Sequence, residues 1–148
     1  MRIWVDADAC PGDVKELLYR AADKRKVTMI FVANQPVRTP RSEYLSSICV
    51  PGGMNMADRH IVDQVEPGDL VITADIPLAA AVIDKGAEAL EFRGELFTAT
   101  SIGERLAARN LLDQLRGGGL ITGGPAGYSS NDRQAFANQF DRWLTKKR

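Results

Sequence analysis

Acidic side chains follow two short apolar segments of the sequence. Asp6 and Asp8 come directly after Ile3-Trp4-Val5, and Asp75 ends the segment 70–75. Continuous apolar runs of this kind are typical of central parallel strands, which helices cover on both faces. Parallel strands place their carboxyl ends at one edge of the sheet, where open α/β sheets bind ligands. We therefore expect these carboxylates to lie close together.

Other oxygen-bearing side chains are expected at the same edge. Asp58 lies near the start of a predicted helix, and Asn34 ends another predicted strand. Carboxylates that lie close together repel one another, so at neutral pH they need a cation or a raised pKa. Oxygen ligands select Mg²⁺ or Mn²⁺ over zinc, and such an ion assists the hydrolysis of phosphate esters. The predicted metal ligands and catalytic residues are Asp6, Asp8, Asp58 and Asp75.

Each of these acids also has a purely structural interpretation. Asp6 and Asp8 precede a predicted helix, which an acid would cap or favour through the helix dipole. Asp58 follows Asn55 by three positions, a spacing that resembles a capping box. Asp75 precedes Ile76 and Pro77, where a helix is expected to begin. The functional interpretation therefore depends on the convergence of the acids and not on any single residue.

Basic residues are concentrated in the last third of the chain. Lys plus Arg and Asp plus Glu each number 19, and this zero net charge excludes a uniformly basic coat for nucleic acid. Residues 93–148 nevertheless hold 9 basic and 5 acidic side chains. Within them a predicted helix places Arg105, Arg109 and Arg116 on one side, and Arg93 precedes that helix. These arginines are candidates for binding phosphate, with a solvated arginine face as the alternative.

Strand-like and helix-like segments alternate along the chain. Apolar spacing predicts strands near 3–5, 27–32, 48–50, 70–75 and 89–92, and helices near 14–22, 56–65, 78–86, 101–116 and 132–144. This alternation predicts an α/β fold of three layers, with a mostly parallel sheet between helices. The length of 148 residues is that of one domain, 1–148. The glycine-rich segment 117–127 is expected to be a loop and lacks a P-loop motif.

Several residues are expected to have no catalytic role. The two cysteines, Cys10 and Cys49, form no CxxC pair, which argues against a Cys/His zinc site. Cys10 is expected to pack as a small apolar residue, and the lone His60 to be a satisfied or surface histidine. Asp63 and Asp69 are expected to be solvated residues. The sequence shows no signal-peptide pattern and no membrane-spanning run. We expect a cytoplasmic location, and the sequence is compatible with a homo-oligomer.

Longer stretches of the sequence resemble the YaiI/YqxD family of small bacterial proteins. They are Ile3-Trp4-Val5-Asp6-Ala7-Asp8-Ala9-Cys10-Pro11, Val32-Ala33-Asn34-Gln35-Pro36, Ala57-Asp58, the segment 68–79 and Asp132-Arg133-Gln134-Ala135-Phe136-Ala137. That family in turn resembles the PIN-like nuclease superfamily. There an acid ends the first strand, another lies on a middle helix, and Thr-x-Asp ends a later strand.

The PIN-like resemblance assigns roles to residues of this chain. Asp6, Asp58 and Thr73-Ala74-Asp75 match the motifs in order. The resemblance implies a PIN-like domain whose acids bind Mg²⁺ or Mn²⁺ and activate water against an RNA backbone. The usual fourth acid has no counterpart here, and Asp8 is the residue available to replace it. A one-metal site and an inactive site both stay open.

Three functions are compatible with these residues. The first is a nuclease for single-stranded RNA, in which the four acids hold the metal, Asn34 and Thr73 support the site, and Arg93, Arg105 and Arg109 bind phosphate. The second is a phosphatase similar to the haloacid dehalogenases, suggested by the Asp-x-Asp motif at the end of the first strand. The third is a module that binds RNA or nucleotides without catalysis.

Overall fold

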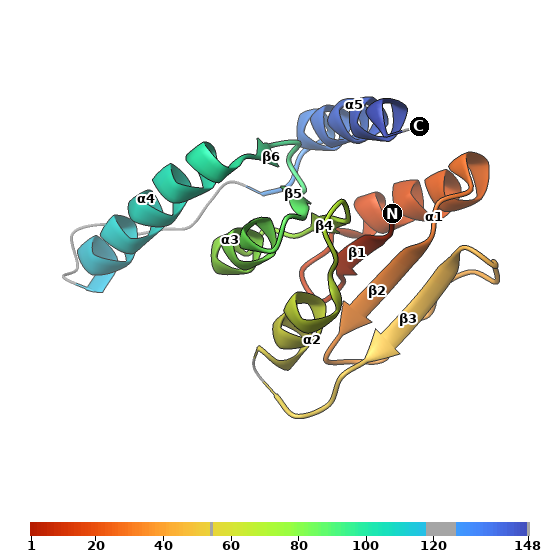
Figure 1. The fold of residues 1–148 in the computed structure, drawn as a ribbon, viewed down its shortest axis with the longest axis horizontal. Helices are drawn as coiled ribbons and strands as arrows, with labels where there is room; N and C mark the ends of the chain where they lie inside the picture. Colours follow the sequence, from red (N-terminus) through yellow and green to blue (C-terminus); the bar gives the residue numbers. More distant parts are fainter. Residues whose placement is uncertain (54, 118–126, 148) are drawn as a thin grey trace.

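Strands and helices alternate along the chain in the computed structural model, which describes residues 1–53, 55–117 and 127–147 (Figure 1). The strands are β1 (Ile3–Asp6), β2 (Met29–Ala33), β3 (Leu45–Cys49), β4 (Leu70–Ile72), β5 (Glu88–Leu90) and β6 (Leu96–Phe97). The helices are α1 (Gly12–Arg25), α2 (Met56–Gln64), α3 (Ile76–Asp84), α4 (Ala99–Gly117) and α5 (Ser130–Lys146). This order confirms the predicted α/β class.

The sheet reverses its strand order between β1 and β4. Its order is β3-β2-β1-β4-β5-β6, and all neighbouring strands are parallel except the antiparallel pair β5 and β6. After β1 the chain builds the sheet outward through β2 and β3, and it then returns to the other side of β1 with β4. Open α/β sheets form a crevice at the carboxyl ends of two such strands. The topology thus places the residues after β1 and β4 at the point where a ligand is expected.

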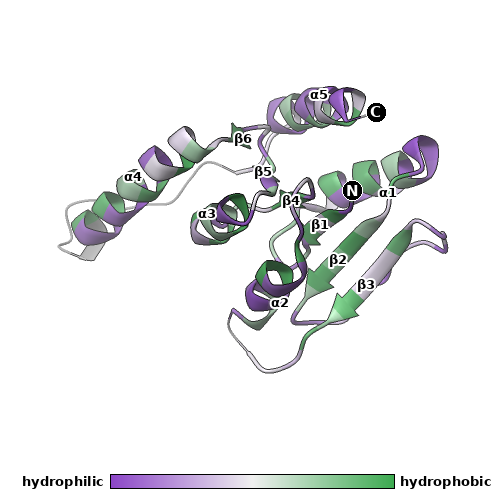
Figure 2. Cartoon of the chain, viewed as in Figure 1, coloured by the Kyte–Doolittle hydropathy of each residue, from purple (hydrophilic) through white to green (hydrophobic). Residues whose placement is uncertain are grey.

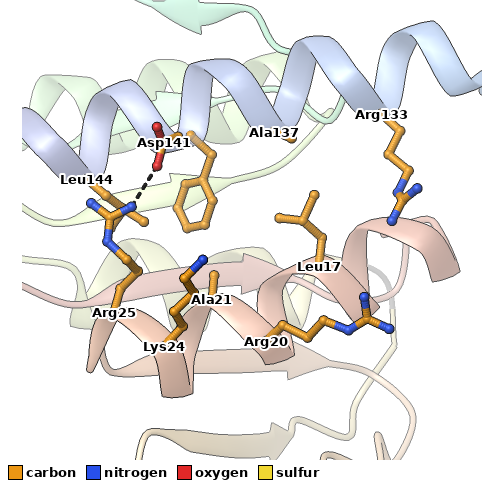
Figure 3. Close-up of a pocket in the computed structure, with 10 residues that line it drawn as sticks. Leu17, Arg20, Ala21, Lys24, Arg25, Arg133, Ala137, Asp141 and Leu144 are labelled. Carbon is orange, nitrogen blue, oxygen red and sulfur yellow. Dashed lines mark hydrogen bonds and ion pairs between the residues drawn. The ribbon is translucent and has the colours of Figure 1, made fainter.

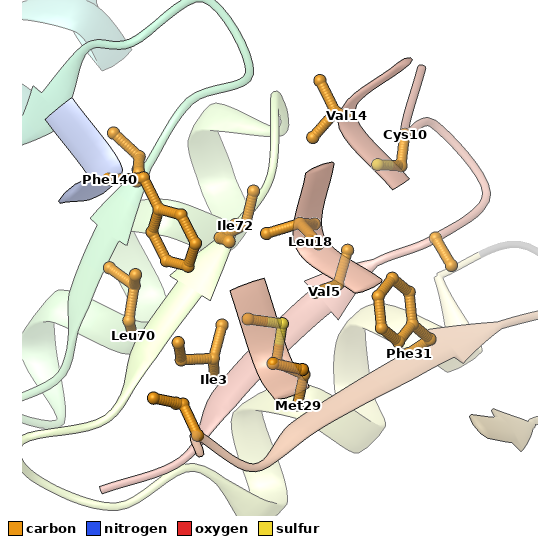
Figure 4. Close-up of a cluster of buried hydrophobic side chains, with 14 of the residues drawn as sticks. Ile3, Val5, Cys10, Val14, Leu18, Met29, Phe31, Leu70, Ile72 and Phe140 are labelled. Atoms are coloured by element: carbon orange, nitrogen blue, oxygen red, sulfur yellow. The ribbon is translucent and has the colours of Figure 1, made fainter. Parts of the chain in front are cut away.

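Helices cover the sheet on both faces. Because successive strand residues face opposite sides, Ile3 and Val5 pack with α1 and α5, whereas Trp4 packs with α2 and α3. Figure 4 shows Ile3, Val5 and Leu18 of α1 in the first of these clusters, and Figure 2 shows β1 and β2 coloured hydrophobic along most of their length. This arrangement confirms the three layers and explains why these strands are apolar on both faces.

Asp69 is buried, so its expected position on the surface is wrong. It is 3% exposed, and its carboxylate accepts hydrogen bonds from the Arg2 backbone N–H (2.9 Å), the Trp4 indole N–H (3.1 Å) and the Glu66 backbone N–H (3.0 Å). These bonds tie the start of β1 to the turn before β4. Asp69 therefore lies at the opposite edge of the sheet from Asp6, while Asp63 is exposed as expected.

The structure bears on some of the remaining expectations and leaves others as predictions. No helix in the described ranges has the length and apolar character that a membrane crossing requires. The glycine-rich segment 117–127 lies mostly outside the described residues. The cytoplasmic location and any self-association stay predictions.

The turn between β5 and β6 provides a test of the packing of α5. Gly94 has φ +96°, and a Cβ atom there would lie 2.7 Å from the carbonyl carbon and oxygen of Ala135 in α5. We expect Gly94→Ala to lower the free energy of unfolding by roughly 2–4 kcal/mol, because backbone strain adds to a clash with another backbone. Urea denaturation followed by circular dichroism measures this change.

Gly103 is the matched control for this substitution. It lies within α4, and a Cβ atom there meets no atom within 4 Å. Gly103→Ala should leave stability unchanged or raise it by up to about 1 kcal/mol, because alanine favours the helix. Equal effects of the two substitutions would contradict this account of how α5 docks.

Candidate functional site

One hydroxyl group connects the carboxyl ends of β1 and β4. Asp6 is the last residue of β1 and is 7% exposed, and Thr73 directly follows β4 and is fully buried. The Thr73 hydroxyl donates to Asp6 Oδ2 over 2.8 Å and accepts the backbone N–H of Asp75 over 3.0 Å. Thr73 therefore fixes the Asp6 carboxylate and the entry into α3 together. Since Thr73 is closed off from solvent, its effect on a ligand must pass through Asp6.

Asp75 has both a structural and a candidate functional position. It is the N-cap of α3, and its Oδ1 accepts the backbone N–H of Leu78 over 3.0 Å, with Pro77 in the first turn. The capping interpretation of Asp75 is thus confirmed. The cap holds the carboxylate at the carboxyl-terminal edge of the sheet, on the same side as Asp6.

Helix capping does not explain the other three acids. The N-cap of α1 is Pro11, with no side-chain cap, and Asp8 Oδ2 instead accepts the backbone N–H of Asn34 over 2.8 Å. The N-cap of α2 is Asn55 in a left-handed conformation (φ 68°), again without a side-chain cap. The capping box suggested by the spacing of Asn55 and Asp58 is therefore not formed. Asp58 lies in the first turn of α2 without capping it.

Two of the four acids, Asp6 and Asp58, have raised pKa values. Burial raises the pKa of Asp58 to about 6, and the negative charges of Asp75, Asp6 and Asp8 add to this effect. Burial also raises the pKa of Asp6 above its usual range, although the Thr73 hydrogen bond opposes the shift. The charges of Asp75 and Asp8 raise it further. Three separate elements and one loop thus bring carboxylates within electrostatic reach of one another.

The oxygen ligands suit a hard divalent cation that keeps part of its water. In the described ranges, no three Asp, Glu, His or Cys side chains form a group that would hold an ion by themselves. Mg²⁺ commonly uses one or two carboxylates and completes its shell with water and phosphate oxygens. Next to Asp8, the Oδ1 atom of Asn34 is buried and has no hydrogen-bond partner among the described residues. Oxygen atoms of this kind are ligands for Mg²⁺ or Mn²⁺, whereas a closed zinc site takes Cys and His ligands.

A cavity lies beside the acids, with residues of α2 and α3 in its wall. Its volume is about 410 Å³, and Asp58, Asp75 and Arg109 are among the residues that line it. Sequence reasoning missed two further lining residues, Asn55 and Arg59. Arg59 follows Asp58 in α2, and nothing in the local sequence distinguishes it from an ordinary surface arginine. The cavity combines carboxylates with guanidinium groups, as a site for a phosphate ester and a cation would.

The structure separates the arginines that the sequence grouped. Arg109 lines the cavity beside the acids and also forms an ion pair with Asp113 at 3.3 Å. Arg105 pairs with Glu95 at 3.2 Å, and Arg93 pairs with Asp132 at 3.4 Å and with Glu91 at 3.9 Å. All three guanidinium groups have a carboxylate partner, but only Arg109 lines this cavity, and its one exposed pair with Asp113 leaves other N–H donors of the guanidinium group for a ligand. The side chain of Arg116 lies outside the described residues.

Cys10 and His60 take structural positions. Burial raises the pKa of the Cys10 thiol to about 12, so this residue packs as a small apolar group, as predicted. The His60 ring lies edge-on to Trp4, with ring centroids 6.3 Å apart. Neither residue contributes a reactive group to the acidic site.

Comparisons with known proteins place the chain in a family. The model of the "Uncharacterized BCR, YaiI/YqxD family" matches residues 4–146. A "UPF0178 protein" of Alkalilimnicola ehrlichii is 59% identical over 148 residues, the whole of both chains. Proteins of the same name from Dechloromonas aromatica and Hahella chejuensis are 58% and 57% identical over 146 residues, which are 99% of this chain and 97% of each relative. No solved structure matches the chain significantly. The chain therefore belongs to the YaiI/YqxD family of uncharacterised bacterial proteins.

Proposed function

We propose that the chain is a Mg²⁺- or Mn²⁺-dependent nuclease that hydrolyses phosphodiester bonds of single-stranded RNA. The observation that carries the proposal is the connection of Asp6 to the backbone of Asp75 through Thr73 where the sheet reverses its strand order, with the charge of Asp58 close by. The resemblance to PIN-like nucleases, whose acids occupy the same positions in the sequence, supports it. The predicted Mg²⁺ or Mn²⁺ cofactor and RNA partner are part of this proposal.

The residues of the site divide into three roles. A divalent ion bound here would polarise a phosphoryl oxygen and lower the pKa of a bound water molecule. Asp6 and Asp75 are the first candidates to hold it, because hydrogen bonds from Thr73 and the α3 backbone fix both carboxylates. The carboxylates of Asp8 and Asp58 add negative charge that attracts the cation. Thr73 is a positioning residue, because it reaches the ligand only through Asp6.

Substrate contacts would come from the cavity beside the acids. Arg109 and Arg59 are the guanidinium groups that line it, and Asp58 and Asp75 lie in the same wall. Guanidinium groups bind phosphate oxygens in paired hydrogen bonds, which orients the ester as well as attracting it. Asn34 adds a buried oxygen acceptor near Asp8. Arg93 and Arg105 have no place in this proposal, because they lie outside the cavity.

The geometry favours a nuclease over a phosphatase of the haloacid dehalogenase type. That mechanism uses a further pair of acids beside the Asp-x-Asp motif, and of Asp69 and Asp75, the two acids around β4, only Asp75 lies near Asp6. Asp69 lies before β4, where it binds Arg2 and Trp4 at the far edge of the sheet. A module that binds RNA without cleaving it uses the same residues as the nuclease, so the two differ only in turnover.

Cleavage of RNA tests the proposal directly. Purified protein with Mn²⁺ should cut end-labelled single-stranded RNA, and EDTA should stop the reaction. Asp6→Asn should lower the rate at least about 100-fold, because the neutral amide attracts a cation weakly. Gel electrophoresis of the labelled products measures the rate.

Asp84→Asn is the matched control for loss of one carboxylate. Asp84 is exposed at the end of α3, outside the acidic site. This variant should cleave like the unmodified protein. Intact RNA after incubation of folded protein with Mn²⁺ would refute catalysis and leave the binding module as the function.

Burial of Asp58 and the negative charges around it should make stability depend on pH. The folded-state pKa of Asp58 is about 6, above its ordinary 3.8, so the folded protein holds this proton more tightly than the unfolded chain. The free energy of unfolding in EDTA should therefore be greater near pH 4 and fall as pH rises to about 6. Asp58→Asn removes the contribution of Asp58 to this slope and should stabilise the protein at pH 7 by about 1 kcal/mol, a value reduced for solvent screening.

Urea denaturation at a series of pH values measures both effects. Asp84→Asn should follow the unmodified protein, since Asp84 is exposed and outside the cluster. Mn²⁺ at pH 7 should raise the stability of the unmodified protein more than that of Asp58→Asn. Parallel pH profiles for the unmodified protein and Asp58→Asn would show that Asp58 titrates normally and that the acids do not interact.

A further inference from the structure

A groove with a basic rim lies between α1 and α5, apart from the acidic site. Its volume is about 250 Å³. Phe140 and Leu144 of α5 and Leu17 of α1 contribute its apolar floor, and the first two are almost fully buried. Figure 3 shows the charged side chains of both helices around this floor. The groove thus has an apolar floor and charged side chains along its sides.

The charge of the groove is strongly positive. Arg20, Lys24 and Arg25 of α1 and Arg133 of α5 line it, and Asp141 is the one acidic residue in the lining. Asp141 accepts a hydrogen bond from Arg25 over 2.6 Å, so that carboxylate is already used. Arg20, Lys24 and Arg133 form no ion pair within the described ranges. Three uncompensated cations therefore gather in a chain whose net charge is zero.

Helix stability explains only part of this charge. Lys24 lies in the last turn of α1, where a cation interacts favourably with the helix dipole. Arg133 has the opposite position, since it is the fourth residue of α5, where the dipole disfavours a cation. Arg20 lies within α1, and Figure 3 shows its guanidinium and that of Arg133 at the same end of the groove. Two cations at the same end of a groove, neither with an ion-pair partner among the described residues, are suited to an anion.

The lining indicates which kind of anion fits. Two helices supply the cations, so several anionic groups in a row would satisfy them better than one. No neutral hydrogen-bonding side chain lines the groove, and its one aromatic ring, Phe140, is 2% exposed. Among the described residues the groove therefore offers no exposed aromatic ring for a base to stack on, and its guanidinium groups favour phosphate oxygens. A ligand recognised here is recognised through its repeated charge.

We infer that the α1/α5 groove binds consecutive backbone phosphates of a single-stranded RNA, without regard to base sequence. The inference rests on the proposed function for the choice of RNA among polyanions. The groove is distinct from the acidic site, because α1 and α5 cover the face of the sheet opposite to α2 and α3. Its cations bind and orient the strand and take no part in hydrolysis. Phosphate binding here needs no metal.

Binding of RNA in the absence of metal tests this inference. Fluorescence anisotropy of labelled oligouridylate in EDTA gives the dissociation constant at a series of KCl concentrations. If the groove neutralises three phosphates of a single strand, the logarithm of the association constant should fall with the logarithm of the KCl concentration with a slope of about −2. The double variant Arg20→Gln/Arg133→Gln should bind at least about tenfold more weakly at low salt, and its slope should shrink to about −0.7.

The double variant Arg41→Gln/Lys146→Gln is the control for equal loss of charge. Both residues are exposed and do not line the groove, so this variant should keep the slope and the affinity. Asp6→Asn should also keep metal-free binding, whatever its effect on cleavage. If the protein does not cleave RNA but still binds it through Arg20 and Arg133, the nuclease proposal is refuted and the inference about the groove stands.

Two results would overturn the groove as an RNA site. One is unchanged affinity and slope in Arg20→Gln/Arg133→Gln, with a melting curve that shows the variant to be folded. The other is an equal loss of RNA affinity in the groove variant and in the control variant. That result would show that the effect comes from net charge and not from the groove. Poly-glutamate is the competitor that tests the choice of RNA. If it displaces the oligonucleotide at a lower concentration of charged groups than RNA does, an acidic polypeptide is the better ligand and the choice of RNA is overturned.

Discussion

Burial of a carboxylate at the end of β1 is the constraint on which the site depends. Removing a charged group from water is unfavourable unless other groups compensate for it. For Asp6 the compensation comes from the Thr73 hydroxyl at 2.8 Å, a group that only β4 can deliver. Pairing of β1 with β4 thus creates the site, and the nearby charges of Asp75 and Asp8 leave it electrostatically strained. A cation would relieve that strain, so the same repulsion that opposes folding favours binding.

The zero net charge of the chain conceals two local excesses. Acids gather at the edge of the sheet where β1 and β4 end, and uncompensated cations gather on the α1/α5 face. Arg93 and Arg105, in the last third of the chain, form ion pairs with nearby carboxylates and lie outside the acidic cavity. A metal-assisted site and a separate basic groove can therefore coexist without the basic coat that high affinity for nucleic acid usually needs.

The sequence predicts those features that depend on local pattern. The central strands are recognisable because burial on both faces makes them continuous apolar runs, and Asp6 and Asp75 are predicted because they directly follow such runs. Features that depend on distant partners escape prediction. Asp69 is buried through Trp4, 65 positions away, and the two-residue strand β6 has no periodicity to detect. The basic groove joins helices from opposite ends of the chain, so neither helix alone shows it.

A crystal structure of the protein soaked in Mn²⁺ tests the central claim most directly, because anomalous scattering locates the ion independently of activity. The account predicts an anomalous peak in contact with the carboxylates of Asp6 and Asp75, with water and other oxygen atoms completing the shell at about 2 Å. A structure in which these two carboxylates are more than roughly 10 Å apart would contradict shared coordination. So would a structure in which Mn²⁺ binds elsewhere and leaves this edge of the sheet without a peak.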